Sequence, residues 1–170
     1  MSNQLEEIHS DTIVSMVRKG KRRLKRPEVG DLFTLEMEGV GFIHGMVARN
    51  EIEFAKGQVE FSIVYIFRDI THSQNDEIKI HKDNLLFPPL IVNDMAWRCG
   101  YFQTHSQVPI SELDVFDNYC FYSRAKAIYE NDKWEPCEAF EPCSDSVLSS
   151  SLTVAIMVYM HLHPKVKVLY

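Results

Sequence analysis

The chain has 170 residues, of which 45% are apolar and 25% are charged, and its formal net charge is −6. This length fits one domain that buries its own core, and the composition excludes a disordered, collagen-like or fibrous chain. The charge is uneven, because residues 1–26 carry a net charge of +4 and residues 27–170 a net charge of −10. The acidic body argues against nucleic acid as its ligand and favours a cationic partner.

The N-terminus and the cysteines together predict a cytoplasmic protein with no membrane partner. Residues 1–7 lack the positive and apolar regions of a signal peptide. The apolar run at 152–160 has nine residues, whereas a membrane span needs about 20. Free thiols are then the expected state of the four cysteines. Cys137 and Cys143 would pair only in an oxidising setting.

Residues 3–19 show the spacing of an amphipathic helix. The apolar residues that fall on one face are Leu5, Ile8, Ile13, Met16 and Val17. Acidic residues near the start and basic residues near the end complement the helix dipole. We therefore predict a helix and a basic arm over residues 1–26, ahead of a single β-rich domain over 27–170.

The body is dominated by strand-like segments. A hairpin turn at Glu38-Gly39 joins the predicted strands 32–37 and 40–47. The segment 59–67 is a further strand, and its second half is apolar enough on both faces to be central. In the predicted strand 40–47, Gly45 is expected to relieve crowding where an aromatic ring crosses the strand. Further strands are expected at 85–93, which would pair with 95–103, and at 119–123, followed by a short hairpin over 126–134.

The segment 149–160 is ambiguous between a helix and a strand. Its β-branched residues favour a strand, whereas the polar residues that precede it favour a helix cap, and we predict a helix. The fold class that follows is mainly β (α+β). We expect a curved antiparallel sheet or partial barrel, with an N-terminal helix and a C-terminal helix.

Three segments in the same order resemble a known family. They are Arg26-Pro-Glu-Val-Gly-Asp-Leu-Phe33, then Gly41-Phe-Ile-His-Gly-Met-Val47, then Leu86-Phe-Pro-Pro-Leu-Ile-Val92 with Trp97-Arg-Cys-Gly-Tyr-Phe102 and Val108-Pro-Ile110. This combination is similar to the bacterial immunity protein 26 family, a grouping named jointly with a HocA-type phosphotriesterase. The resemblance covers about residues 26–124. It implies a β-rich fold and, as the leading function, an intracellular protein that binds and neutralises a cognate polymorphic toxin.

An inhibitor of this kind needs a surface that blocks the toxin's catalytic cleft, and acidic side chains suit a basic nuclease because they mimic phosphates. The expected binding residues are Trp97, Glu112, Asp114, Phe116 and Asp117. Asp76 and Glu77 form a second acidic site. Trp97 has two interpretations, as a core anchor or as an interface residue. This function requires no cofactor.

The alternative function is a metal-assisted phosphotriesterase that hydrolyses organophosphate triesters. A divalent metal such as zinc would generate the attacking hydroxide. His161 and His163 would share an ion if they lay on a strand, because side chains at i and i+2 then share a face. On a helix they would diverge by about 200°. His44 is a further candidate if Asp31 or Glu36 approaches it, and the catalytic residues themselves stay unknown.

Overall fold

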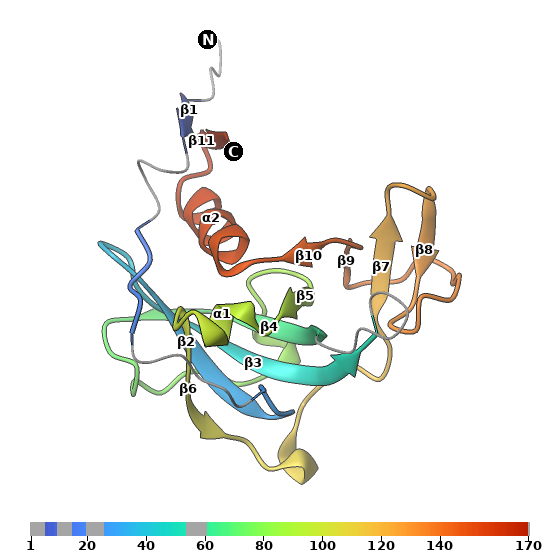
Figure 1. Ribbon diagram of the computed structural model, residues 1–170, viewed down its shortest axis with the longest axis horizontal. Coiled ribbons are helices and arrows are strands. Elements are labelled where there is room, and N and C mark those ends of the chain that lie inside the picture. Colours follow the sequence, from blue (N-terminus) through green and yellow to red (C-terminus); the bar gives the residue numbers. More distant parts are fainter. Residues whose placement is uncertain (1–5, 10–14, 20–25, 54–60, 170) are drawn as a thin grey trace.

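The computed structural model describes residues 6–9, 15–19, 26–53 and 61–169, and it confirms the mainly β fold (Figure 1). The main sheet is open, with β10 and β6 at its edges, and every neighbouring pair is antiparallel except β10–β5. Its strands, in spatial order, are β10 (Leu148–Ser149), β5 (Leu90–Asn93), β4 (Phe61–Thr71), β3 (Gly41–Ile52), β2 (Asp31–Met37) and β6 (Phe102–Gln107).

A smaller sheet and two helices complete the described structure. The smaller sheet consists of β8 (Ile128–Glu130), β7 (Cys120–Ser123) and β9 (Cys143–Asp145), and it stands at the right of Figure 1. The helices are α1 (Met95–Arg98) and α2 (Ser151–Leu162), with 3-10 turns η2 (Lys82–Asn84) and η3 (Ile110–Glu112). A separate parallel pair joins β1 (Glu6–His9) to β11 (Val166–Leu169).

The predicted N-terminal helix is wrong over the described residues. Residues 6–9 form β1, and residues 15–19 are not helical. The backbone N–H of Val17 donates to the carbonyl of Glu36 at 2.9 Å, and that of Glu38 donates to Ser15 at 2.8 Å. These hydrogen bonds occupy backbone groups at the end of β2, where its pairing with β6 has stopped. Pairing with the sheet therefore outweighs the helical spacing of the apolar residues. Residues 10–14 and the basic run 20–25 lie outside the described residues.

The C-terminal helix is confirmed as α2. The hydroxyl of Ser150 accepts a hydrogen bond from the backbone N–H of Thr153 at 3.1 Å and so caps the first turn. The strand predicted over 95–103 is instead α1 followed by β6, and β6 pairs with β2 rather than with β5. The turn between them passes through Gly100 at φ +79°, a conformation that suits glycine.

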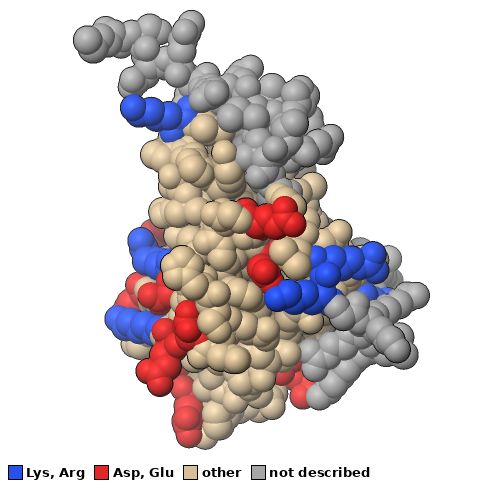
Figure 2. All heavy atoms as spheres, turned by 90° about the vertical axis from the view of Figure 1, so that its left-hand side faces the viewer, with Lys and Arg blue, Asp and Glu red and all other residues tan. Residues whose placement is uncertain are grey.

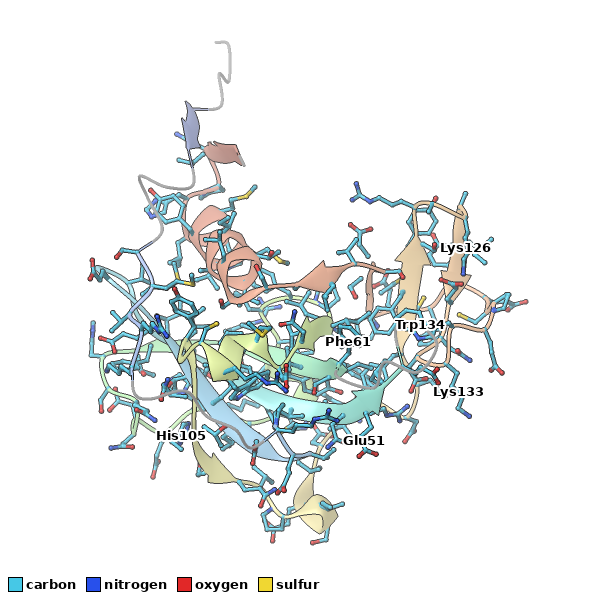
Figure 3. All side chains as sticks on the ribbon, viewed as in Figure 1. Glu51, Phe61, His105, Lys126, Lys133 and Trp134 are labelled. Carbon is cyan, nitrogen blue, oxygen red and sulfur yellow. The ribbon has the colours of Figure 1, made fainter. Side chains whose placement is uncertain are left out.

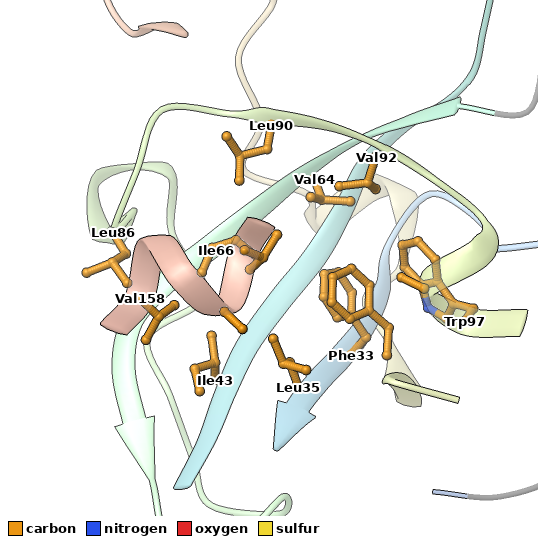
Figure 4. Close-up of a cluster of buried hydrophobic side chains, with 14 of the residues drawn as sticks. Phe33, Leu35, Ile43, Val64, Ile66, Leu86, Leu90, Val92, Trp97 and Val158 are labelled. Atoms are coloured by element: carbon orange, nitrogen blue, oxygen red, sulfur yellow. The ribbon is translucent and has the colours of Figure 1, made fainter. Parts of the chain in front are cut away.

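Apolar side chains cover both faces of the main sheet. On one face, Phe33, Leu35 and Met37 share one side of β2 as predicted, and α2 and Trp97 pack over them (Figure 4). On the other face, alternate residues of β4 pack beneath the start of the smaller sheet. The central position predicted for 59–67 is therefore confirmed for its described part, because β4 lies between β3 and β5 and is buried on both sides.

Gly45 confirms its predicted role in β3. A Cβ atom at this position would overlap the ring of Phe33 and would lie 2.7 Å from the carbonyl oxygen of Tyr65. The ring of Phe33 thus crosses the strand where a side chain is missing, and the close packing of β2 on β3 depends on glycine at this position.

Candidate functional site

Two loops meet below the main sheet, and Asp114 joins them. Its carboxylate accepts a hydrogen bond from the backbone N–H of Lys82 at 2.9 Å. The same carboxylate lies 3.3 Å from Lys82 Nζ and 3.0 Å from His81 Nε2. Asp114, which the sequence predicted as a binding residue, is therefore occupied in fixing the β6–β7 loop against the β4–β5 loop.

The joined loops bring the two predicted acidic segments into one region, which we call the acidic loop surface. Residues 108–118 contain three acidic and no basic residues. The exposed carboxylates of the surface are Asp76, Glu77, Asp83, Glu112 and Asp117. Glu112 and Asp117 thus have the exposure that a binding role requires.

Ile110 is the most exposed of the large apolar side chains on the described residues, at 77%. It begins η3, where the backbone N–H of Glu112 donates to the carbonyl of Pro109 at 2.9 Å and the N–H of Leu113 donates to Ile110 at 3.4 Å. This short turn projects the isoleucine from the acidic loop surface. No periodic pattern in the sequence indicates this exposure, since a single isoleucine after proline is equally typical of a strand end.

Phe116, which the sequence predicted as a binding residue, packs its ring inward against two tyrosines. Its ring centroid lies 5.7 Å from that of Tyr65 and 6.5 Å from that of Tyr119. Its backbone N–H donates to the Tyr65 hydroxyl at 2.8 Å, and Lys82 Nζ lies 5.9 Å from the ring centroid. Phe116 therefore anchors the loop that carries Asp117 rather than presenting its ring to a partner.

Trp97 lies in the core and is 2% exposed. Its ring packs edge-on against Phe33 and Phe102, with centroid separations of 5.1 and 4.9 Å. Its indole Nε1 donates to the hydroxyl of Thr104 at 3.2 Å. Of the two interpretations of Trp97, the structure therefore supports the core anchor.

The two histidines expected under the enzyme alternative lie at the end of α2. His161 is in the last turn, and its ring faces Phe87, whereas His163 caps the helix and faces Tyr159. The strand geometry that would let both imidazoles share one ion is absent here. Within the described part of the chain, no group of three or more histidines, cysteines or carboxylates is arranged to hold a metal ion. The phosphotriesterase alternative stays a prediction from the resemblance.

A cavity of about 460 Å³ adjoins the acidic loop surface and contains a histidine pair. His44 and His105 have ring centroids 6.4 Å apart at 90°, and Asp76 and Glu77 also line the cavity. His44 is 2% exposed. Burial lowers the pKa of both imidazoles, and for His44 the neighbouring His105 lowers the pKa further while more distant carboxylates oppose this effect. Both shifts favour the neutral form of the imidazoles.

The partner of His44 differs from the expected Asp31 or Glu36. His44 Nε2 lies 2.7 Å from the hydroxyl oxygen of Thr71, and that hydroxyl donates to the carbonyl of Ser73 at 2.7 Å. Because Thr71 uses its proton on Ser73, it accepts from His44, which places the proton on Nε2. The sequence did not indicate that His105 lies beside His44. The segment 95–103 was expected to pair with 85–93, whereas β6 pairs with β2.

A second cavity, of about 770 Å³, lies at the opposite end of the main sheet, between β3 and the smaller sheet. Figure 3 shows Trp134, Lys126 and Glu51 at this end, away from His105. Its lining carries both signs of charge, and two of its cations are neutralised in the pairs Arg49–Asp132 and Lys126–Glu130. The mixed charge gives this cavity no clear preference for cationic or anionic ligands.

Charged side chains of both signs are interspersed on the face shown in Figure 2, with a broad uncharged area between them. No helix among the described residues is long and apolar enough to span a membrane. No protein-family model, curated protein or solved structure matches the chain. The resemblance to the immunity protein family therefore stays an expectation drawn from the sequence.

Proposed function

We propose that this protein is a cytoplasmic immunity-type binding protein that neutralises a cognate toxin domain through the acidic loop surface. The observation that carries the proposal is Ile110, which projects at 77% exposure from a region where Glu112 and Asp117 are also exposed. An apolar side chain surrounded by carboxylates has the composition of an interface centre and its polar rim. The family resemblance supplies the class of partner.

The chemistry of the surface favours a basic partner. Residues 108–118 carry three carboxylates and no positive charge. Asp114 is paired with Lys82 of the other loop, which leaves Glu112 and Asp117 as the exposed carboxylates of this segment. Carboxylates at an interface attract a cationic protein over long range and speed encounter. A toxin that acts on nucleic acid has a basic cleft, and the carboxylates of Glu112 and Asp117 would occupy positions that phosphates take in the substrate.

The anchoring of the loops supports a preformed surface. The hydrogen bond from Lys82 to Asp114 and the one from Phe116 to Tyr65 fix the loop at two positions immediately before Asp117. Binding then loses less conformational entropy than it would with a loose loop, which favours a tight complex.

The test is binding to the purified toxin domain encoded beside this chain's gene, measured by calorimetry on the full chain. We expect Ile110→Asp to weaken binding by about 30-fold, the loss typical of a central contact. The matched control is Val147→Asp, because Val147 is also an exposed apolar side chain, at 50%, but follows β9 on the far side of the molecule.

A charge-reversed pair gives a second measurement. Glu112→Lys with Asp117→Lys should lower the association rate and reduce its dependence on salt, because the long-range attraction is removed. Glu138→Lys with Glu141→Lys makes the same charge change elsewhere on the surface. Absence of binding to the toxin, or equal losses for Ile110→Asp and Val147→Asp, would count against the proposed function.

A further inference from the structure

The fold brings together thiols that are far apart in the sequence. Cys120 begins β7, Cys143 begins β9, and the two strands pair in parallel with these two residues directly opposite each other. Their Sγ atoms are 3.0 Å apart, although 23 positions separate the residues in the chain. Neighbouring strands lie about 4.8 Å apart, which is within the range of Cα separations, about 4.4–6.8 Å, that a disulfide spans.

A third thiol flanks this pair. The backbone N–H of Cys137 donates to the carbonyl of Tyr129 at 2.9 Å, so Cys137 lies beside β8, the other neighbour of β7. Its side chain interacts with that of Cys120. Cys120 is buried, whereas Cys137 and Cys143 are partly exposed. Three of the four cysteines therefore form one cluster with a buried member and two solvent-accessible members.

We propose that Cys120 and Cys143 form a reversible disulfide that cross-links β7 to β9, with a glutathione-type disulfide as the oxidant. Cys143 is the entry thiol, because it is partly exposed while Cys120 is buried. Cys120 is the resolving thiol, because its Sγ already contacts the Sγ that would become linked to glutathione. This site is independent of the acidic loop surface and of the toxin-binding proposal.

The exchange balances in two steps. The Cys143 thiolate attacks one sulfur of oxidised glutathione, whose S–S bond breaks, and the departing glutathione takes up the proton that Cys143 lost. Cys120 then loses its proton and attacks Cys143 Sγ in the mixed disulfide, releasing the second glutathione. Two electrons pass from the protein thiols to oxidised glutathione, and the product is two molecules of reduced glutathione.

The surroundings of the cluster set the pH dependence of this reaction. Burial raises the pKa of Cys143 to about 12, and its contact with Cys120 together with Glu141 and Cys137 acts in the same direction. Burial likewise raises the pKa of Cys137, with Cys120 and Glu130 contributing. Because the thiolate is the attacking species, the rate of disulfide formation should rise steeply from pH 7 to pH 9.

The experiment is disulfide mapping on the native full-length chain. The protein is incubated with oxidised glutathione at pH 8.5, alkylated, digested without reduction and examined by mass spectrometry. We expect a Cys120–Cys143 peptide pair, with Cys99 alkylated, and a return to four free thiols after dithiothreitol. Four free thiols after incubation, or a dominant Cys120–Cys137 or Cys137–Cys143 pair, would overturn the proposal.

Single-cysteine variants give a second readout. Cys143→Ser should leave Cys120 without its mapped partner, whereas Cys137→Ser should keep the Cys120–Cys143 pair. Cys99→Ser is the matched control, because Cys99 is also partly exposed but caps α1, outside the cluster. If Cys143→Ser does not fold, the mapping on the unmodified chain still decides the outcome. Loss of the pair in Cys99→Ser would contradict the assignment.

Discussion

Asp114 and Lys82 make two contacts across 32 positions of the chain. One carboxylate oxygen of Asp114 accepts from the backbone N–H of Lys82 at 2.9 Å, and the other lies 3.3 Å from its Nζ. The two residues belong to different loops, the β6–β7 and the β4–β5 connections. The arrangement of the acidic loop surface therefore depends on a partly buried contact. The two residues that make this contact do not themselves need to touch a partner.

Removing this carboxylate should loosen both loops and lower stability. Asp114→Ala leaves the Lys82 N–H without its acceptor, which we expect to reduce the free energy of unfolding by about 1–2 kcal/mol. Asp117→Ala, an exposed neighbour, should change it by less than about 0.5 kcal/mol. Urea denaturation of both variants measures the difference, and equal values for the two would refute the tethering role.

The Asp114 contact should also depend on pH. Partial desolvation acts to raise the pKa of this carboxyl, but the hydrogen bonds from Lys82 and the charges of His81 and Lys82 outweigh it, so the pKa is lowered. A lowered folded pKa stabilises the protein above the unfolded value of about 3.9, and this stabilisation is lost as the pH falls below about 4. The free energy of unfolding, measured between pH 6 and pH 3, should therefore fall less in Asp114→Asn than in the unmodified chain.

Tyr65 connects the core to the same loop. Its hydroxyl accepts from the backbone N–H of Phe116 at 2.8 Å and lies 3.2 Å from the Tyr119 hydroxyl, and burial raises its pKa. Tyr65→Phe removes the acceptor of a partly buried amide, which should cost about 1–3 kcal/mol. Tyr129→Phe, at an exposed side chain, is the control and should cost little. Thermal unfolding of both variants measures this, and a neutral Tyr65→Phe would show that the amide finds another acceptor.

Local sequence patterns predicted the centre of the fold well. The alternation of Phe33, Leu35 and Met37 indicated one face of β2, and Gly45 indicated the crossing of an aromatic ring. Both signals depend on near neighbours in the chain. The N-terminal segment failed because its hydrogen-bond partner, the end of β2 at Glu36, is set by where β6 stops pairing, and no local pattern contains that information.

The candidate site was predictable in its charges and unpredictable in its geometry. Glu112 and Asp117 were chosen for their clustering and are exposed, but the sequence did not show that Asp114 would tether a second loop. Phe116 and Ile110 are both apolar residues near these carboxylates. Which of them faces solvent is decided by the aromatic neighbours that Phe116 finds, Tyr65 among them.

The lowered pKa of His44 predicts a second pH effect, at higher pH. Burial first, and His105 second, lower the pKa of His44 against the opposing charges of Asp69 and Asp76. A lowered pKa contributes stability that is present above the unfolded value of about 6.5 and is lost as the pH falls through the folded value. Stability should therefore decline between pH 7.5 and pH 5.5.

Substitution separates the contribution of His44 from that of the other histidines. His44→Gln keeps an N–H donor for Thr71 without a titrating ring, so the decline between pH 7.5 and 5.5 should be smaller than in the unmodified chain. His163→Gln, at an exposed position, should follow the unmodified chain. Urea unfolding at the two pH values supplies the comparison, and parallel declines for His44→Gln and the unmodified chain would exclude His44 as the cause.

The proposed Cys120–Cys143 disulfide predicts a redox dependence of stability. A cross-link that closes a loop over 23 positions restricts the unfolded chain, which corresponds to about 3 kcal/mol in the chain-entropy treatment. Glutathione-oxidised protein should therefore unfold at higher urea concentration than protein kept in dithiothreitol. Cys99→Ser should retain this difference, and Cys143→Ser should abolish it. Equal midpoints for oxidised and reduced protein, with the disulfide mapped in the oxidised sample, would show that native-state strain cancels the entropic gain.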